Sequence, residues 1–297
     1  MTRSAIGLAA TALLCLFAPG CTGKETEGAP EGGTVPIGGE LQICRDCPDF
    51  VRVPDAPQGI RPIRFVAKYE LTWNNYLAAY DAGRCNIPNP NTGIRYKKGP
   101  NDLLADVESL RIDWPANQLG PNEVKCYIAW LQEKTPYLVA LPDVEEWEWF
   151  ARAGRTNAKF PWGNEPDANK EALCGNTNIE KLRLPPATMA MASRAHMQGV
   201  APGQFPPNDW GLYDVMGSLY ELTSVVISGK DWYVQHPDSR WASYTKNRDH
   251  AVLKGGDNAF CDWSKEGISG QATAVIWDGR YTTSVAIRLV FVERGGE

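Results

Sequence analysis

The chain has 297 residues, of which 43% are hydrophobic and 22% charged, so a large core can form and global disorder is excluded. Its 30 Lys and Arg residues against 35 Asp and Glu residues give a formal charge of −5, which argues against unspecific nucleic-acid binding. The 28 Gly, 22 Pro, 11 Trp and 11 Tyr residues predict a loop-rich fold anchored by large aromatic side chains, in one domain or two.

The first 20 residues have the features of a secretory signal. Arg3 precedes an apolar run from Ala5 to Ala18, which is shorter than the roughly 20 residues of a spanning helix. The sequence Ala18-Pro19-Gly20-Cys21 resembles a bacterial lipobox, whose cysteine receives lipid. We therefore expect residues 1–20 to be a lipoprotein signal peptide and Cys21 to be lipidated. The alternative is an ordinary cleaved signal with Cys21 incidental.

Residues 21–40 are rich in Gly, Pro, Glu and Thr and have few apolar groups, which is typical of a flexible linker. Thr22 follows Cys21 where an Asp would favour the inner membrane. We expect an exported protein, periplasmic or on the cell surface, held at the outer membrane through the lipid alone.

The cysteines favour disulfides. Of the 8 cysteines, Cys15 leaves with the signal and Cys21 is expected to carry lipid. An even remainder in an exported protein predicts disulfide bonds whose pairing the sequence cannot decide. Cys44 and Cys47 also have zinc-ligand spacing, but no second such pair follows, so a disulfide is preferred there. The six disulfide candidates are Cys44, Cys47, Cys85, Cys126, Cys174 and Cys261.

Three helices are predicted before residue 155. Thr72 caps the first, which Gly83 ends, with one face made by Trp73, Tyr76, Leu77 and Tyr80. The second runs from about Glu123 to Glu133, with Asn122 as its cap. The third begins at Asp143 in a capping box with Glu146 and stops at Gly154, and its apolar face is Val144, Trp147, Phe150 and Ala151.

The chain from Arg155 to about Val252 has little periodicity and many Gly and Pro residues, which predicts irregular structure. Two later segments have the pattern of strands: Ala251 to Lys254, and the alternating stretch from Val285 to Val292.

Several segments together resemble the formylglycine-generating enzyme family, also called the sulfatase-modifying-factor domain. The motifs occur in the family's order between residues 41 and 294, as CPDFVRVP (47–54), KYELT (68–72), LPDVEEWEWFARAG (141–154), FPWG (160–163), NDWGLYDVMG (208–217), VLKGG (252–256) and AIR (286–288). The resemblance implies one α+β domain over residues 41–294, of the C-type-lectin-like kind and with little regular secondary structure.

The family's oxidases hold copper(I) with two cysteine thiolates, the near-linear soft ligands that this ion favours. Cys261 lies near the first of these positions and is the candidate catalytic residue, but Lys265-Glu266-Gly267 stands where the second should be, and no cysteine follows Cys261. The copper(I) site is therefore expected to be incomplete. Cys261 remains open to three roles: a disulfide, a functional thiol or a metal ligand.

The family also binds calcium through oxygen ligands of a GNVWE segment. This chain keeps Glu221 but has Ser218 in place of the Asn. A serine is a shorter and weaker oxygen donor, so either Ser218 and Glu221 hold Ca²⁺, or Glu221 is a hydrogen-bonded structural carboxylate.

The residues that differ from the family's catalytic motifs indicate a binding function. Asp257 and Asn258 replace a serine and an aromatic residue of the family's catalytic strand. We expect a monomeric module that binds an unknown protein or small molecule through the loops near residues 255–283, with Asp257, Asn258, Trp263 and Trp277 as ligand contacts. The alternative is a copper- or oxygen-dependent oxidoreductase that acts on cysteine-containing peptides, or a related periplasmic oxidation.

Overall fold

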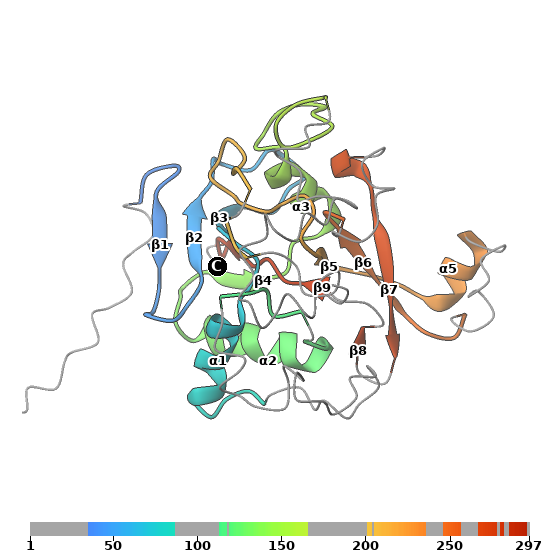
Figure 1. Cartoon of the computed structure of the whole chain (residues 1–297), viewed down its shortest axis with the longest axis horizontal. Helices are drawn as coiled ribbons and strands as arrows, with labels where there is room; N and C mark the ends of the chain where they lie inside the picture. Colours follow the sequence, from blue (N-terminus) through green and yellow to red (C-terminus); the bar gives the residue numbers. More distant parts are fainter. Residues whose placement is uncertain are drawn as a thin grey trace, which may run out of the picture.

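A computed structural model describes residues 35–86, 113–117, 119–165, 201–203, 205–235, 246–256, 267–277, 280–281 and 285–295. Two five-stranded sheets form its framework (Figure 1). The first has the order β1-β2-β3-β10-β4, all antiparallel. Its strands are β1 (Glu40–Gln42), β2 (Asp49–Arg52), β3 (Ile63–Ala67), β10 (Val290–Val292) and β4 (Leu138–Ala140).

The second sheet has the order β8-β7-β6-β5-β9 and lies on the opposite side of the molecule in Figure 1. Its pairs are antiparallel except β5 and β9, which run parallel. Its strands are β5 (Tyr220–Ile227), β6 (His250–Lys254), β7 (Ala272–Trp277), β8 (Arg280–Tyr281) and β9 (Val285–Ala286). Because β9 and β10 belong to different sheets, the short segment between them carries the chain from one sheet to the other.

That crossover corrects the prediction of one strand from Val285 to Val292. The alternating pattern is present, but every residue from 285 to 292 is buried, so no face of the segment lies toward solvent. Leu71 N donates to Ile287 O and Ala67 N to Leu289 O, which ties the segment to neighbouring chain outside any sheet ladder. Arg288, a buried charge, lies at the break and pairs with Glu221 of the second sheet.

Two of the helix predictions are confirmed closely. α1 (Trp73–Asp81) begins after Thr72, whose Oγ1 accepts from Asn75 N, and Gly83 follows it with φ +68°. α3 (Val144–Ala151) begins after Asp143, which forms the expected capping box with Glu146. Two face residues differ from expectation, since Tyr80 is exposed and Val144 is only partly buried.

The second helix starts earlier than predicted. α2 (Pro121–Gln132) has Gly120 as its N-cap, and Glu123 Oε2 accepts from Gly120 N at 3.1 Å. Asn122 is therefore inside the helix, because Pro121 already has the φ that a first helical residue needs. The described part of the stretch expected to be irregular contains two regular elements that the sequence did not indicate, β5 and α5 (Gly229–Gln235).

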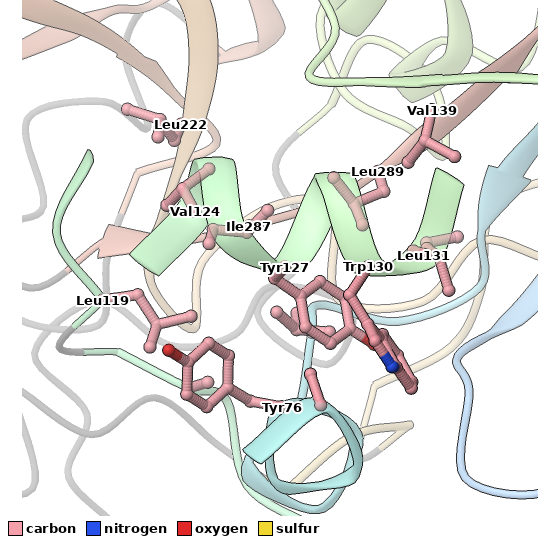
Figure 2. Packing of buried hydrophobic residues seen from close by; sticks show 14 of the residues in the cluster. Tyr76, Leu119, Val124, Tyr127, Trp130, Leu131, Val139, Leu222, Ile287 and Leu289 are labelled. Carbon is pink, nitrogen blue, oxygen red and sulfur yellow. The ribbon is translucent and has the colours of Figure 1, made fainter. Parts of the chain in front are cut away.

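The buried hydrophobic residues form two clusters, and the larger one runs between the two sheets and includes residues of α1 and α2. Figure 2 shows α2 with Tyr127 and Trp130 directed toward Tyr76 of α1, and with Val124 near Leu222 and Ile287 of the second sheet and crossover. The rings of Tyr76 and Tyr127 stack at 5.8 Å. None of the helices in the described ranges is both long and apolar enough to cross a membrane.

Candidate functional site

A buried ion pair lies where the two sheets meet. Glu221 is the second residue of β5, and Arg288 lies in the crossover between β9 and β10. Both side chains are at most 1% exposed. Tyr220 and Glu221 pair with Val285 and Ala286 in parallel register, which brings the start of β5 beside the start of the crossover. The pairing of β5 with β9 therefore places the two charged residues close to each other.

The pair is bidentate. Arg288 Nη2 lies 2.6 Å from Glu221 Oε1, and Arg288 Nε lies 2.9 Å from Oε1 and 3.0 Å from Oε2. Trp147 Nε1 donates to Oε2 at 2.7 Å, from the buried face of α3. The carboxylate thus accepts from a guanidinium and an indole, which compensates the cost of burying its charge.

The other donors of Arg288 hold two backbone segments. Nη1 donates to Ala67 O at 2.9 Å and Lys68 O at 3.1 Å, and Nη2 donates to Tyr213 O at 2.8 Å. Burial alone would lower the pKa of Arg288, but the attraction of Glu221 raises it above its ordinary value. Arg288 therefore stays charged and links the end of β3, the 213 turn and β5.

Two further carboxylates lie close to this pair. Ser218 Oγ donates to Glu70 Oε2 at 2.9 Å, and Gly203 N donates to Asp214 Oδ2 at 2.6 Å. Burial, followed by repulsion from Glu221, raises the pKa of Glu70 well above its ordinary value. Burial also raises the pKa of Asp214 from 3.8 to about 6. The cluster therefore holds more carboxyl groups than its one guanidinium neutralises.

These contacts do not fit a calcium ion at Ser218 and Glu221. A hard cation takes about six to eight oxygen ligands, whereas both oxygens of Glu221 already accept N–H donors from Arg288 and Trp147. Within the described residues no group of three or more His, Cys, Asp or Glu side chains could hold a metal ion. The contacts of Glu221 are those of a hydrogen-bonded carboxylate, and whether the protein binds Ca²⁺ stays a prediction.

α3 also holds both ends of the chain segment that contains Cys261. On one side of this segment, Lys254 of β6 is fully buried and donates to Glu148 Oε1 at 2.8 Å. On the other side, Arg152 Nη2 donates to Ser269 Oγ at 3.0 Å, and Arg152 also pairs with Glu148 at 2.8 Å. The hydrogen bonds of Lys254 and Arg152 lower the pKa of Glu148, although its burial acts in the opposite direction.

Sequence reasoning missed the role of Glu148. The available signal was the spacing of Glu148 and Arg152, four residues apart on one helix face, beside a lysine in a strand that is otherwise apolar.

Four of the six predicted disulfide cysteines are paired. Cys44 bonds Cys47, and Cys85 bonds Cys126. The remaining two, Cys174 and Cys261, lie outside the described residues, as does the lipidation candidate Cys21. The predicted ligand contacts Asp257, Asn258 and Trp263 and the side chain of Trp277 are also outside them. The structure therefore places Ser218 beside Glu70 and Glu221 beside Arg288 and Trp147, but it does not test the proposed ligand loops.

Two sheets, short helices and long connections define a loop-rich α+β domain of the C-type-lectin-like class. Residues 29–281 match the domain family described as "Sulfatase-modifying factor enzyme 1-like domain". The chain belongs to this family, the formylglycine-generating enzyme family.

The relatives of this chain include proteins named as formylglycine-generating enzymes and proteins named as inactive ones. The chain is 28% identical over 151 residues to "Formylglycine-generating enzyme" of Mus musculus, covering 50% of this chain and 35% of that protein. It is 33% identical over 139 residues to "Inactive C-alpha-formylglycine-generating enzyme 2" of Bos taurus, covering 46% and 40%. The match to the enzyme of Thermomonospora curvata is 30% over 145 residues, covering 48% and 42%. The alignments thus span less than half the length of these relatives.

Solved structures support the fold. PvdO from Pseudomonas aeruginosa superposes with a TM-score of 0.56 at 22% identity, covering 86% of this chain and 99% of that one. CarF superposes with a TM-score of 0.50 at 13% identity, covering 77% and 86%. At these identities the likeness extends to the fold alone.

Proposed function

We propose that this chain is an exported, lipid-anchored binding module built on a formylglycine-generating-enzyme domain that lacks the two-cysteine copper site. The observation that carries the proposal is the use of its cysteines. Four are joined in the disulfides Cys44–Cys47 and Cys85–Cys126. No cysteine follows Cys261 in the sequence. The two thiolates that the family places close together after the glycine-rich strand are therefore reduced to one.

The four cysteines in the two disulfides cannot supply a second thiolate for copper(I). Of the six cysteines expected in the mature protein, only Cys174 remains to do so. In an oxidising compartment, two neighbouring thiols form a disulfide unless a metal or a reductant protects them. We therefore expect Cys174 and Cys261 to be bonded to each other. A relative named as inactive is compatible with a family scaffold that has lost its chemistry.

The scaffold around the altered segment is intact, which supports a binding role. Glu148 and Arg152 hold the flanks of the segment through Lys254 and Ser269. Asp257, Asn258, Trp263 and Trp277 are the proposed ligand contacts in and after that segment. Trp263→Ala and Trp277→Ala should each weaken capture of a ligand, while Tyr233→Ala on the exposed face of α5 should not. Unchanged capture by both tryptophan variants contradicts this assignment.

The anchor is tested separately. Lipid on Cys21 predicts that the protein fractionates with the outer membrane and that Cys21→Ser releases it to the soluble periplasmic fraction. A wild-type protein already soluble in the periplasm contradicts lipidation, and one in the cytoplasm contradicts export.

The second candidate is a copper- or oxygen-dependent oxidoreductase that acts on cysteine-containing peptides, or a related periplasmic oxidation. It is favoured by the position of Cys261 and by the relatives named formylglycine-generating enzyme. Copper(I) titration of the protein with its disulfides intact, followed by incubation with a cysteine-containing sulfatase-type peptide, separates the two proposals. Stoichiometric tight copper together with a mass loss on the peptide supports the enzyme.

A further inference from the structure

A groove of about 680 Å³ lies beside the beginning of α1, within the size range of ligand pockets in proteins. Four segments line it: the turn between β1 and β2, the connection from β3 into the first residues of α1, and the short segments at residues 113–114 and 201–202. We call it the β1–α1 groove and define it by Asp46, Asp49, Tyr69, Glu70, Asp113 and Trp114.

Hydrogen bonds between its walls hold the groove open. Asn75 Nδ2 donates to Asp46 O at 3.1 Å, and Asn74 Nδ2 donates to Asp113 Oδ1 at 2.6 Å. Trp73 N donates to Trp114 O at 2.9 Å. The Cys44–Cys47 disulfide closes the turn that carries Asp46. A ligand would therefore meet a preformed surface and would not have to order it.

The groove is acidic. Four carboxyl groups line it, from Asp46, Asp49, Glu70 and Asp113, against one cationic side chain, Arg45. Lys68 lies nearby, but its ammonium is paired with Glu40 at 2.7 Å. A low-dielectric groove with this charge imbalance attracts a cation and repels an anion.

Glu70 supplies an observation independent of the charge count. Its side chain is only 3% exposed, and its Oε1 has no hydrogen-bond partner among the described residues, while Oε2 accepts from Ser218. Buried polar atoms without a partner are rare in folded proteins, and each calls for an explanation. Burial, then repulsion from Glu221, raises the pKa of Glu70. Oε1 itself is closed to solvent, so a positive charge bound in the groove would act on Glu70 by offsetting its repulsion with Glu221.

The aromatic residues of the groove restrict the kind of cation. Trp114 is half-buried, and so is Tyr69, whose ring already has Lys68 Nζ 5.3 Å from its centroid. Aromatic faces attract organic ammonium groups and pack against their carbon chains. A small metal ion would gain nothing from these rings and would prefer a closer set of oxygens.

We infer that the β1–α1 groove binds an alkylammonium ligand, with the ammonium toward Glu70 and Asp49 and the carbon chain against Tyr69 and Trp114. This goes beyond the proposed function, because the groove contains none of the loop residues near 255–283 and does not involve Cys261. The ammonium can belong to a free diamine or polyamine, or to a lysine side chain of another protein.

The test is calorimetric titration of the purified protein, at low salt and pH 7.5, with three probes. Cadaverine represents the free diamine, Nα-acetyl-lysine amide represents a lysine side chain, and 1,5-pentanediol is the neutral isostere of cadaverine. At least one amine should bind with one-to-one stoichiometry, and the diol should not bind. Binding of cadaverine supports a free amine, and binding of the lysine amide alone supports a protein side chain.

Glu70→Gln and Trp114→Ala should each weaken amine binding at least tenfold. The Glu70→Gln substitution keeps the shape of the side chain and an oxygen that can still accept from Ser218, and a thermal melt verifies that each variant is folded. Asp49→Asn, at the wall of the groove, is the second charge variant if Glu70→Gln unfolds. Glu145→Gln removes an exposed carboxylate on α3 and should leave binding unchanged. The inference is overturned if neither amine binds, if the diol binds as well as cadaverine, or if folded groove variants bind like the wild type.

Discussion

The guanidinium of Arg288 lies 2.6 Å from the carboxylate of Glu221, although 67 residues separate them along the chain. Arg288 sits in the crossover between the two sheets and Glu221 at the start of β5, so this contact joins the sheets at their junction. Its surroundings are closed to solvent, which makes it sensitive to the loss of either partner.

Arg288→Met should lower the free energy of unfolding by about 3–5 kcal/mol, because it leaves Glu221 as a buried charge without its counter-ion. Chemical denaturation followed by tryptophan fluorescence measures this change. Arg84→Met, which removes an exposed pair with Glu133, is the matched control and should leave the midpoint unchanged. Equal losses of unfolding free energy in the two variants would contradict the prediction, because the buried pair would then stabilise the protein no more than the exposed one.

Stability should fall as pH rises from about 4 to 6, in part because of Asp214. Burial raises the pKa of Asp214 from 3.8 to about 6, so in this window the folded state keeps a proton that the unfolded chain has released. The folded state binds more protons, so the unfolding free energy decreases through the window and stays lower above it. Glu70, whose pKa is also raised by burial, acts in the same direction.

Asp214→Asn should flatten this slope and stabilise the protein at pH 7 by up to about 3 kcal/mol. Asn tolerates the left-handed backbone of this position, where φ is +54°. Denaturation midpoints between pH 4 and 7 provide the measurement, with the exposed Asp209→Asn as control. An unchanged slope in Asp214→Asn would assign the pH dependence to other groups.

Gly267→Ala should destabilise the protein more than Gly83→Ala. The two glycines have similar left-handed backbones, with φ of +62° and +68°, so the intrinsic strain of alanine is matched. A Cβ at Gly267 would lie 2.1 Å from Lys159 O, whereas nothing lies within 4 Å of one at Gly83. We expect a difference of about 1–3 kcal/mol, the usual cost of overpacking. Similar melting temperatures for both variants would mean that the turn at Gly267 can shift away from Lys159 O at little cost.

Removing the Cys85–Cys126 bond should cost more stability than removing Cys44–Cys47. The cysteines are 41 residues apart in the first bond and 3 in the second. In the chain-entropy account, a loop of about 40 residues corresponds to about 4 kcal/mol and a very short loop to about 2. Paired Cys→Ala variants, unfolded under non-reducing conditions, give the two values. The reverse order would indicate that the short turn at the β1–α1 groove matters through its packing.

Local chemistry in the sequence predicted the caps of α1 and α3 because each depends on residues within one turn, as Thr72 and Asp143 show. It missed the break at Arg288, because a hydrophobic alternation looks the same whether it lies in one strand or crosses between two sheets. The partner that decides the matter, Glu221, is distant in sequence. The family motifs in the sequence supplied the fold class, which periodicity alone did not.

The site was predicted less completely for the same reason. Ser218 and Glu221 were recognised from a motif, but the donors that occupy Glu221 come from α3 and the crossover. The β1–α1 groove combines residues from four separated segments, and only the packed structure brings Glu70 and Trp114 to one surface.

Copper(I) titration of the protein with its disulfides intact, combined with mass spectrometry of a cysteine-containing sulfatase-type peptide incubated with it, tests the central claim most directly. The account predicts no stoichiometric tight copper(I) site and an unchanged peptide mass, because Cys261 has no second thiolate in the family's position. One tightly bound copper(I) per chain, lost in Cys261→Ser, together with a mass loss on the peptide, would contradict it.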